Sequence, residues 1–130
     1  MILGIGTDLV DIKRIEHLVN TKGEAFIQRV FSKVEQIQAE TRAQGPRRMA
    51  FYATRFAAKE ACAKALGTGI RDGITFQDMV ITNDALGKPL LTLYNKALDR
   101  LLTLGDKPRI DLSLSDEYPI GVAFVIISTE

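Results

Sequence analysis

Apolar and polar positions change their spacing several times along the chain. At its start, residues 2–10 are rich in Ile, Leu and Val and predict a β-strand. Gly4 and Gly6 interrupt this run, which indicates that another backbone or a ligand comes close to the strand. Because side chains alternate along a strand, Asp8 lies on the same face as these two glycines. We therefore expect Asp8 in a pocket or a buried site and not on an ordinary solvated surface.

Helical spacing follows this strand. Three helices are predicted in the first half of the chain, over residues 11–21, 24–43 and 49–66. Asp11 is the expected N-cap of the first helix, and Ser32 marks a candidate break in the second. The third helix follows a GPRR sequence, and Gly67 gives it the ending typical of a glycine C-cap.

Strand patterns dominate the second half of the chain. They cover residues 74–84, the beginning of 90–102, 109–117 and 121–128. A tight turn is expected at 85–89, and the segment 90–102 passes from a strand into a helix that ends near Gly105. The order strand, helices, two strands with a helix and two further strands predicts an α+β fold with a mostly antiparallel sheet.

Composition narrows the class of protein. The 130 residues suit one compact domain, which we expect to span 1–130. Hydrophobic residues make up 46% and charged residues 25%, as in folded globular proteins. A formal net charge of +1 excludes a strong overall attraction to nucleic acid, and the absence of Trp argues against an aromatic platform for single strands. Cys62 is the single cysteine, which excludes an intramolecular disulfide.

No targeting or membrane segment is predicted. The first residues lack the basic region of a signal peptide and reach Asp8 after only a few apolar positions. No window approaches the length of a membrane span. These patterns predict a cytoplasmic protein.

A Glu–Lys pair on the third helix raises the main question about function. On a helical wheel, Glu60 lies in the middle of an apolar side, and Lys64 lies one turn later at its edge. Arg55 and Lys59 point away from that side. One interpretation is an i,i+4 ion pair on a surface helix, which stabilises by only about 0.2–0.5 kcal/mol.

The other interpretation is that this pair is buried and has a third charged partner. Two charges in a dry interior cost about as much in desolvation as they recover in attraction. Mg²⁺ bound to phosphate would be such a partner, because Mg²⁺ takes carboxylate and phosphate oxygens while a lysine offsets the remaining phosphate charge. Asp8 is then the natural second carboxylate. Spacing alone leaves both interpretations open.

Three motifs give the chain a family resemblance. They are GIGTDLVDIKRIE at 4–16, RFAAKEACAKALGTG at 55–69 and LGKP at 86–89. Together they resemble the holo-acyl-carrier-protein synthases, the small 4′-phosphopantetheinyl transferases of fatty acid synthesis. The resemblance covers essentially the whole chain, because the motifs occur in the family's order and spacing. It implies the α+β fold of these transferases, with the sheet packed against a long central helix, and a homotrimer with active sites between neighbouring chains.

The resemblance also implies a reaction. Such enzymes move the phosphopantetheine arm of coenzyme A to a serine of an apo acyl carrier protein and release adenosine 3′,5′-bisphosphate. By motif matching, Asp8 and Glu60 bind Mg²⁺, and Lys64 contacts phosphate at the reacting end. Glu60 is the candidate base for the serine, directly or, as we prefer, through a metal-bound water. Arg14 on the first helix is expected to receive the acidic carrier protein.

Further residues are expected to contact the coenzyme. These are Arg47, Arg55, Phe56, Gly67, Thr68, Gly69, Lys88, Pro89 and Ser115. One departure concerns the strand near Ser115: many relatives place a histidine where this chain has Asp116. An aspartate cannot replace that histidine as a cation, so no catalytic role is assigned to this position.

Two other functions compete with the transferase. A binding module could keep the fold and the surface for an acidic partner while lacking chemistry, but it would have no need to retain Asp8, Glu60 and Lys64. A different Mg²⁺-dependent nucleotide enzyme would be expected to carry a phosphate-cradling loop such as GxxxxGK[ST], and the sequence contains none. We therefore prefer the transferase.

Overall fold

A computed structural model of the chain describes residues 1–42 and 45–130. Its main sheet has three antiparallel strands in the order β1-β5-β4, formed by β1 (Ile2–Asp11), β5 (Ile120–Ser128) and β4 (Arg109–Glu117). A second sheet pairs β2 (Met79–Asn83) with β3 (Pro89–Leu93), also antiparallel. The helices are α1 (Ile12–Lys22), α2 (Glu24–Val30), α3 (Lys33–Arg42), α4 (Pro46–Leu66) and α5 (Asn95–Leu104), with a 3₁₀ turn, η1 (Phe76–Asp78), before β2. This α+β arrangement agrees with the prediction from the sequence.

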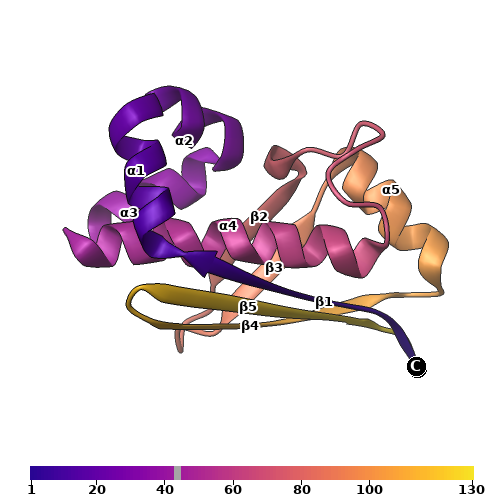
Figure 1. Ribbon diagram of the computed structural model, residues 1–130. Helices are drawn as coiled ribbons and strands as arrows, with labels where there is room; N and C mark the ends of the chain where they lie inside the picture. The colour runs from indigo at the N-terminus through magenta and orange to yellow at the C-terminus, as the bar shows by residue number, and fades with distance from the viewer. Residues whose placement is uncertain (43–44) are drawn as a thin grey trace.

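The long helix α4 lies along one face of the main sheet, next to β1 (Figure 1). The two glycines of β1 permit this close packing. A Cβ atom at Gly6 would stand 1.9 Å from the carbonyl oxygen of Ala61, and one at Gly4 would stand 2.1 Å from that of Ala65. Both distances are far shorter than any real contact, so a backbone and not a ligand explains these glycines.

Helices cover the two ends of α4 (Figure 1). The helices α1, α2 and α3 gather around its N-terminal half. At its C-terminal end, α5 is tied to α4 by Arg100, whose Nε donates to the carbonyl oxygen of Leu66 at 2.9 Å. The ends of the chain lie side by side, because the backbone N–H of Thr129 donates to the carbonyl oxygen of Met1 at 2.8 Å.

Several local predictions are confirmed. Asp11 caps α1 through its side chain, which accepts a hydrogen bond from the N–H of Lys13 at 2.9 Å. The second predicted helix is broken at Ser32 into α2 and α3, and its predicted last residue, 43, lies outside the described residues. Gly67 ends α4 in the left-handed conformation with φ 82°. The strand predicted over 74–84 is shorter than expected, because a capping box formed by Thr75 and Asp78 holds the η1 turn there.

The helical-wheel interpretation of α4 is wrong in one respect. Lys59, expected to point away from the core, is completely buried at 0% exposure. Glu60 is only half-buried, and the side chain of Lys64 is 55% exposed. The buried ion pair of this helix therefore involves Lys59 and not Lys64. The prediction failed because other elements cover α4 on nearly all sides. A residue outside the apolar side of the helix, such as Lys59, can therefore still be buried.

The outer face of the main sheet is apolar and exposed. The side chains that alternate outward include Ile5 and Leu9 of β1 and Ile120 and Phe124 of β5, each at least 41% exposed. Their neighbours in sequence, such as Val125, face α4 and are buried. β5 is thus apolar on both faces, as the sequence predicts. Over the described residues, no helix is long and apolar enough to cross a membrane.

Candidate active site

The three charged residues singled out by the sequence meet where β1 passes α4. Asp8 lies on the same face of β1 as Gly4 and Gly6, which is the face that packs against α4. The ammonium of Lys64 donates to Asp8 Oδ1 at 3.0 Å and to the carbonyl oxygen of Thr7 at 3.0 Å. The close approach of the two backbones at Gly6 is therefore what brings this strand carboxylate to the helix.

Glu60 lies one turn before Lys64 on the same helix and completes an acidic pair. Burial raises the pKa of Glu60, and the charge of Asp8 raises it further, while Lys64 and Arg14 act in the opposite direction. Asp8 and Glu60 are thus near enough to repel each other. The site assembles side chains from β1, α1 and α4 whose charges act on one carboxyl group.

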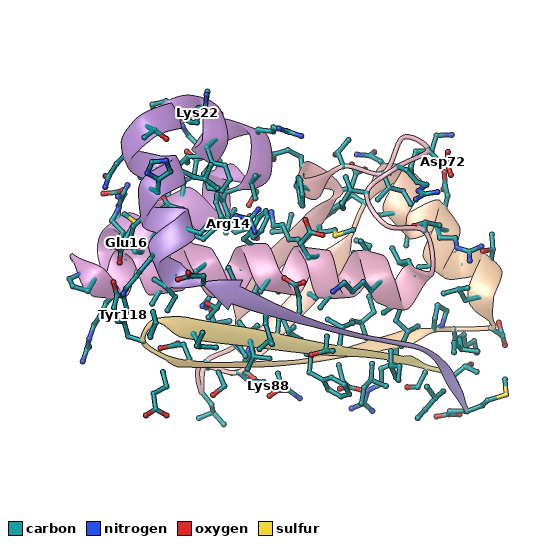
Figure 2. The ribbon with its side chains drawn as sticks, in the orientation of Figure 1. Arg14, Glu16, Lys22, Asp72, Lys88 and Tyr118 are labelled. Atoms are coloured by element: carbon teal, nitrogen blue, oxygen red, sulfur yellow. The ribbon has the colours of Figure 1, made fainter. Side chains whose placement is uncertain are left out.

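Arg14 reaches this cluster from the first turns of α1. This helix starts directly after β1, so the capped junction at Asp11 fixes its direction relative to the strand. Arg14 is exposed and projects from α1 over α4 (Figure 2). It therefore combines two properties: its charge acts at Glu60, and its guanidinium is open to an approaching partner.

The donor set of this site fits Mg²⁺. Asp8 and Glu60 offer carboxylate oxygens, the ligands that Mg²⁺ prefers. A cation between them would offset both causes of the raised pKa of Glu60, which are its burial and the charge of Asp8. Within residues 1–42 and 45–130, no cluster of three His, Cys, Asp or Glu side chains could hold a metal ion. The protein would thus supply two ligands, and water and substrate phosphate would supply the others, as is usual for Mg²⁺.

A shallow hollow of ≈ 360 Å³ adjoins Lys64. Its lining joins β1 residues to Phe124 on the outer face of the sheet: Ile5, Gly6, Thr7, Lys64 and Phe124. The charged cluster therefore opens onto the exposed apolar face of the sheet. A ligand bound at the cluster has room to extend in that direction.

The glycine loop after α4 lies close to the cluster. Gly67 directly follows the last turn of α4, and its N–H donates to the carbonyl oxygen of Lys64 at 3.0 Å. The Thr68 hydroxyl donates to the carbonyl oxygen of Gly69 at 3.0 Å. At Gly69, φ is 72°, and a Cβ atom placed there would have no atom within 4 Å. The backbone at Gly69 is therefore accessible to another molecule. These three predicted coenzyme residues are near the predicted catalytic lysine.

Other predicted coenzyme residues are placed elsewhere. The guanidinium of Arg55 stacks on the ring of Phe51, 3.8 Å from its centroid, and faces Asn83 of β2. Arg47 is exposed in the first turn of α4. Glu60 is thirteen positions further along the chain, which is about 20 Å in a helix that rises about 1.5 Å per residue. Phe56, one turn before Glu60, is in contact with aromatic rings of α2 and η1.

The residues of the β2–β3 turn and of β4 also lie apart from the cluster. Lys88 lies beyond the β4–β5 hairpin, on the opposite side from Arg14 (Figure 2). Pro89 begins β3 just after it. Ser115 is exposed on β4, paired with Val122 of β5, and the neighbouring Asp116 is also exposed. A single chain therefore does not bring these residues to Glu60.

The ion pair of Lys59 with Glu35 was not predicted from the sequence. The Nζ of Lys59 lies 2.7 Å from Glu35 Oε1, and both side chains are fully buried. A signal was present in the sequence: Ser32 followed by Glu35 has the spacing of a capping box. That signal predicts the start of α3 but not the partner that lies on α4.

Comparisons with known proteins show the family of this chain. A family model described as the 4′-phosphopantetheinyl transferase superfamily matches residues 4–123. The holo-[acyl-carrier-protein] synthase of Afipia carboxidovorans is 52% identical over 98% of this chain and 96% of its own length.

Solved structures show the same similarity. The crystal structure of the holo-[acyl-carrier-protein] synthase from Neisseria meningitidis has a TM-score of 0.85 and 43% identity, over 99% of this chain and all of that one. The synthase from Bacillus anthracis, in complex with CoA (3′,5′-ADP), has a TM-score of 0.83 and 34% identity, over 100% of this chain and 99% of that one. The chain described here therefore belongs to the 4′-phosphopantetheinyl transferase superfamily.

Proposed function

We propose that this chain is a holo-acyl-carrier-protein synthase that acts in the cytoplasm. It transfers the 4′-phosphopantetheine group of coenzyme A to a serine of an apo acyl carrier protein. The serine oxygen forms a bond to the phosphorus that carries pantetheine, the P–O bond to the nucleotide breaks, and adenosine 3′,5′-bisphosphate leaves. The proposal is supported by a relative of the same name that is 52% identical and by a similar structure in complex with CoA (3′,5′-ADP).

One observation of the structure carries the proposal. Asp8 and Glu60 come from different elements, yet they lie near each other beside Lys64 and Arg14. Two carboxylates next to two cations suit a diphosphate with its metal, because phosphoryl transfer is catalysed chiefly by positioning the groups and offsetting their charge. A pure binding module would gain nothing from the repulsion between these two carboxylates.

Asp8 and Glu60 would hold Mg²⁺. When bound, the ion supplies positive charge that neutralises the diphosphate and polarises its phosphorus. The protein contributes the fixed distance between its two ligands, since Asp8 is part of β1 and Glu60 is part of α4, and the glycines of β1 hold these elements together.

Glu60 and Lys64 would handle the proton and the leaving charge. Glu60 would accept the proton of the serine, directly or through a water, because its carboxyl group stands beside Asp8 and Lys64 at the reacting end. Lys64 has three donors, of which its partners Asp8 and Thr7 take two. Its exposed ammonium would stabilise the negative charge on the departing phosphate.

Arg14 would receive the carrier protein. It is exposed at the entrance to the cluster, and acyl carrier proteins are acidic, so opposite charges would guide the serine toward Glu60. The open backbone at Gly69 and the ring of Phe56 would border the coenzyme, because both lie within a few residues of the cluster on α4 or its C-terminal loop.

We further propose a homotrimer with active sites between neighbouring chains. The remaining coenzyme contacts, from Arg47, Arg55, Lys88, Pro89 and Ser115, would then be completed by an adjacent chain. Two observations support this assembly: Lys88 lies on the far side of the β4–β5 hairpin from Arg14, and the outer face of the sheet is apolar and exposed. Monomeric proteins rarely leave a large apolar face exposed, and three copies that pack against one another here would bury it.

Mass spectrometry tests the proposed reaction. An apo acyl carrier protein incubated with this protein, coenzyme A and Mg²⁺ is expected to gain the mass of phosphopantetheine. The gain should disappear in Asp8→Ala and Glu60→Ala and with an excess of chelator. If the unaltered protein produces no gain, the proposal fails.

A further inference from the structure

The buried lysine of α4 has no part in the reaction described above. Lys59 is 0% exposed and directly precedes Glu60 in the sequence. Its Nζ donates to Glu35 Oε1 at 2.7 Å and to the carbonyl oxygens of Val30 at 2.6 Å and Phe76 at 3.1 Å. An ammonium has three donors, so its hydrogen bonding is complete. Because Val30 ends α2 and Phe76 begins η1, this one side chain joins three segments to α4.

Glu35 extends the same connection to a fourth segment. Its Oε1 also accepts the N–H of Ser32 at 2.8 Å, and its Oε2 accepts the N–H of Ile81 in β2 at 2.8 Å. The N–H of Glu35 in turn donates to the hydroxyl of Ser32 at 3.3 Å, which completes a capping box at the start of α3. One carboxylate therefore fixes the corner between α2 and α3 against β2 and α4.

The segments joined by Lys59 form a cavity. It measures ≈ 330 Å³ and lies between the end of α2 and the segment around η1, lined by Gln28, Arg29, Ile70, Thr75, Phe76 and Gln77. Gln77 connects these two walls a second time, because its Nε2 donates to the carbonyl oxygens of Gln28 at 2.7 Å and Phe31 at 2.8 Å. The ring of Phe76 also contacts Phe56, one turn before Glu60. The cavity wall thus continues to the catalytic helix.

Stability alone does not account for this ion pair. Burying both charges costs desolvation free energy, and apolar residues of similar size often stabilise a protein as well or better. Apolar contacts are non-directional, however, and would leave the segments free to shift against one another. The five short hydrogen bonds of Lys59 and Glu35 have fixed directions and lengths. These hydrogen bonds therefore fix the positions of the joined segments relative to α4.

We propose that Lys59, through its pair with Glu35, is a positioning residue for the transfer reaction. The pair holds the α2–α3 corner and the η1 wall against α4. Only Gly23 separates α2 from α1, the helix that carries Arg14, so the same corner fixes where Arg14 stands relative to Glu60. This inference rests on the proposed function. It predicts that loss of the pair weakens productive docking of the carrier protein while the charged cluster and its affinity for the nucleotide product are retained.

A single and a double variant distinguish a loss of positioning, seen in KM, from a loss of stability, seen in Tm. Lys59→Met alone leaves a buried carboxylate without its cation and is expected to lower Tm. Lys59→Met combined with Glu35→Gln removes both charges, and the amide oxygen at position 35 can still accept from one of the two backbone N–H groups, so its Tm should recover part of the way toward that of the unaltered protein. Despite this recovery, the KM for the apo carrier protein should stay raised by about tenfold or more. The affinity for adenosine 3′,5′-bisphosphate, measured by calorimetry, should be unchanged.

Controls make each outcome decisive. Lys107→Met removes an exposed lysine near the start of β4, outside the Lys59–Glu35 pair and the segments it joins, and should change neither Tm nor KM. If the folded double variant has the carrier-protein KM of the unaltered protein, the positioning role is wrong. If the double variant does not fold, Glu35→Asp decides, because it keeps both charges and draws the carboxylate back from Lys59 by one methylene: a raised carrier-protein KM supports the role, and an unchanged KM overturns it. A failure of the unaltered protein to modify any carrier protein would instead contradict the proposed function.

Discussion

At the scale of single residues, the ionised carboxylate of Glu60 is unfavourable in the folded chain as long as no cation is bound beside it. Asp8 has Lys64 as an ion-pair partner at 3.0 Å, whereas Glu60 is half-buried and faces the charge of Asp8. Burial and this like charge raise the pKa of Glu60, which means that the folded chain disfavours its ionised form. A binding site for a cation commonly shows this property before the cation is bound.

Glu60→Gln tests this property through the pH dependence of stability. A carboxyl group whose pKa is raised by folding lowers the free energy of unfolding as the pH rises, because the unfolded chain ionises more readily than the folded one. The effect is absent below the unfolded value of about 4.5, grows as the pH rises through the folded pKa, and is complete above it. Thermal denaturation without metal should therefore show equal stability of variant and unaltered protein near pH 4 and a more stable variant near pH 8.

Two comparisons complete this experiment. The exposed Glu117→Gln should leave the difference between the two pH values unchanged. Added Mg²⁺ should raise Tm at pH 8 for the unaltered protein and have little effect on Glu60→Gln, because binding to the folded state alone stabilises it. A variant that is less stable than the unaltered protein at pH 8 would show that Glu60 is held by favourable contacts and is not poised for a cation.

Cys62 provides a second prediction at this scale. The side chain is buried in α4, and burial raises the pKa of its thiol to about 12. The reactive thiolate is then about 10⁻⁴ of the population at pH 8. Alkylation of the native protein at pH 8 should proceed only as fast as the protein unfolds, and denaturant should make it rapid. Fast labelling in native buffer would contradict the burial of this residue.

At the scale of elements, the packing of β1 against α4 decides where the carboxylates stand. Gly6→Ala would place a methyl group 1.9 Å from the carbonyl oxygen of Ala61, and backbone must move to relieve this clash. We expect a loss of about 2–3 kcal/mol in the free energy of unfolding, measured by denaturant titration. The transfer rate should fall more than the folded fraction does, because a shift of the strand moves Asp8 away from Glu60.

Gly87→Ala is the matched control for this substitution. Gly87 has φ 89° in the β2–β3 turn, and no atom lies within 4 Å of a Cβ placed there. Its replacement should cost only the strain of a left-handed residue, about 1 kcal/mol. If Gly6→Ala costs no more than this control, the close backbone contact is not the reason for the glycine.

The elements also show how far local patterns reach. The Asp11 cap, the break at Ser32 and the end of α4 at Gly67 were predictable because short-range hydrogen bonds and backbone conformation determine them. The chemistry of the residues suggested Asp8 as the second carboxylate beside Glu60 and Lys64, but only as one of two open interpretations, since a strand and a helix can approach in many ways. The burial of Lys59 depends on Glu35, a partner 24 positions away, and periodicity along one helix contains no information about it.

At the scale of the whole molecule, one chain holds the charged cluster but leaves predicted coenzyme residues apart from it. Lys88 lies across the β4–β5 hairpin from Arg14, and Arg47 lies about 20 Å from Glu60 along α4. The hollow beside Lys64 opens toward Phe124 on the exposed face of the sheet. If a second chain packs near that face, residues such as Lys88 and Arg47 of one chain can lie beside the charged cluster of the other. Activity would then depend on assembly.

Phe124→Asp tests this relation. Phe124 is 41% exposed at the centre of the outer sheet face, so a charge there should cost little in a monomer and much in a dry interface between chains. Equilibrium sedimentation should show a trimer for the unaltered protein and a folded monomer for the variant, with transfer activity reduced at least tenfold. The control, Leu102→Asp, places the same charge on α5 at a residue that is 58% exposed and should remain trimeric and active. A stable monomer with full activity, in the unaltered protein or in the variant, would mean that one chain forms the complete site, and the coenzyme contacts assigned to a neighbour would then be wrong.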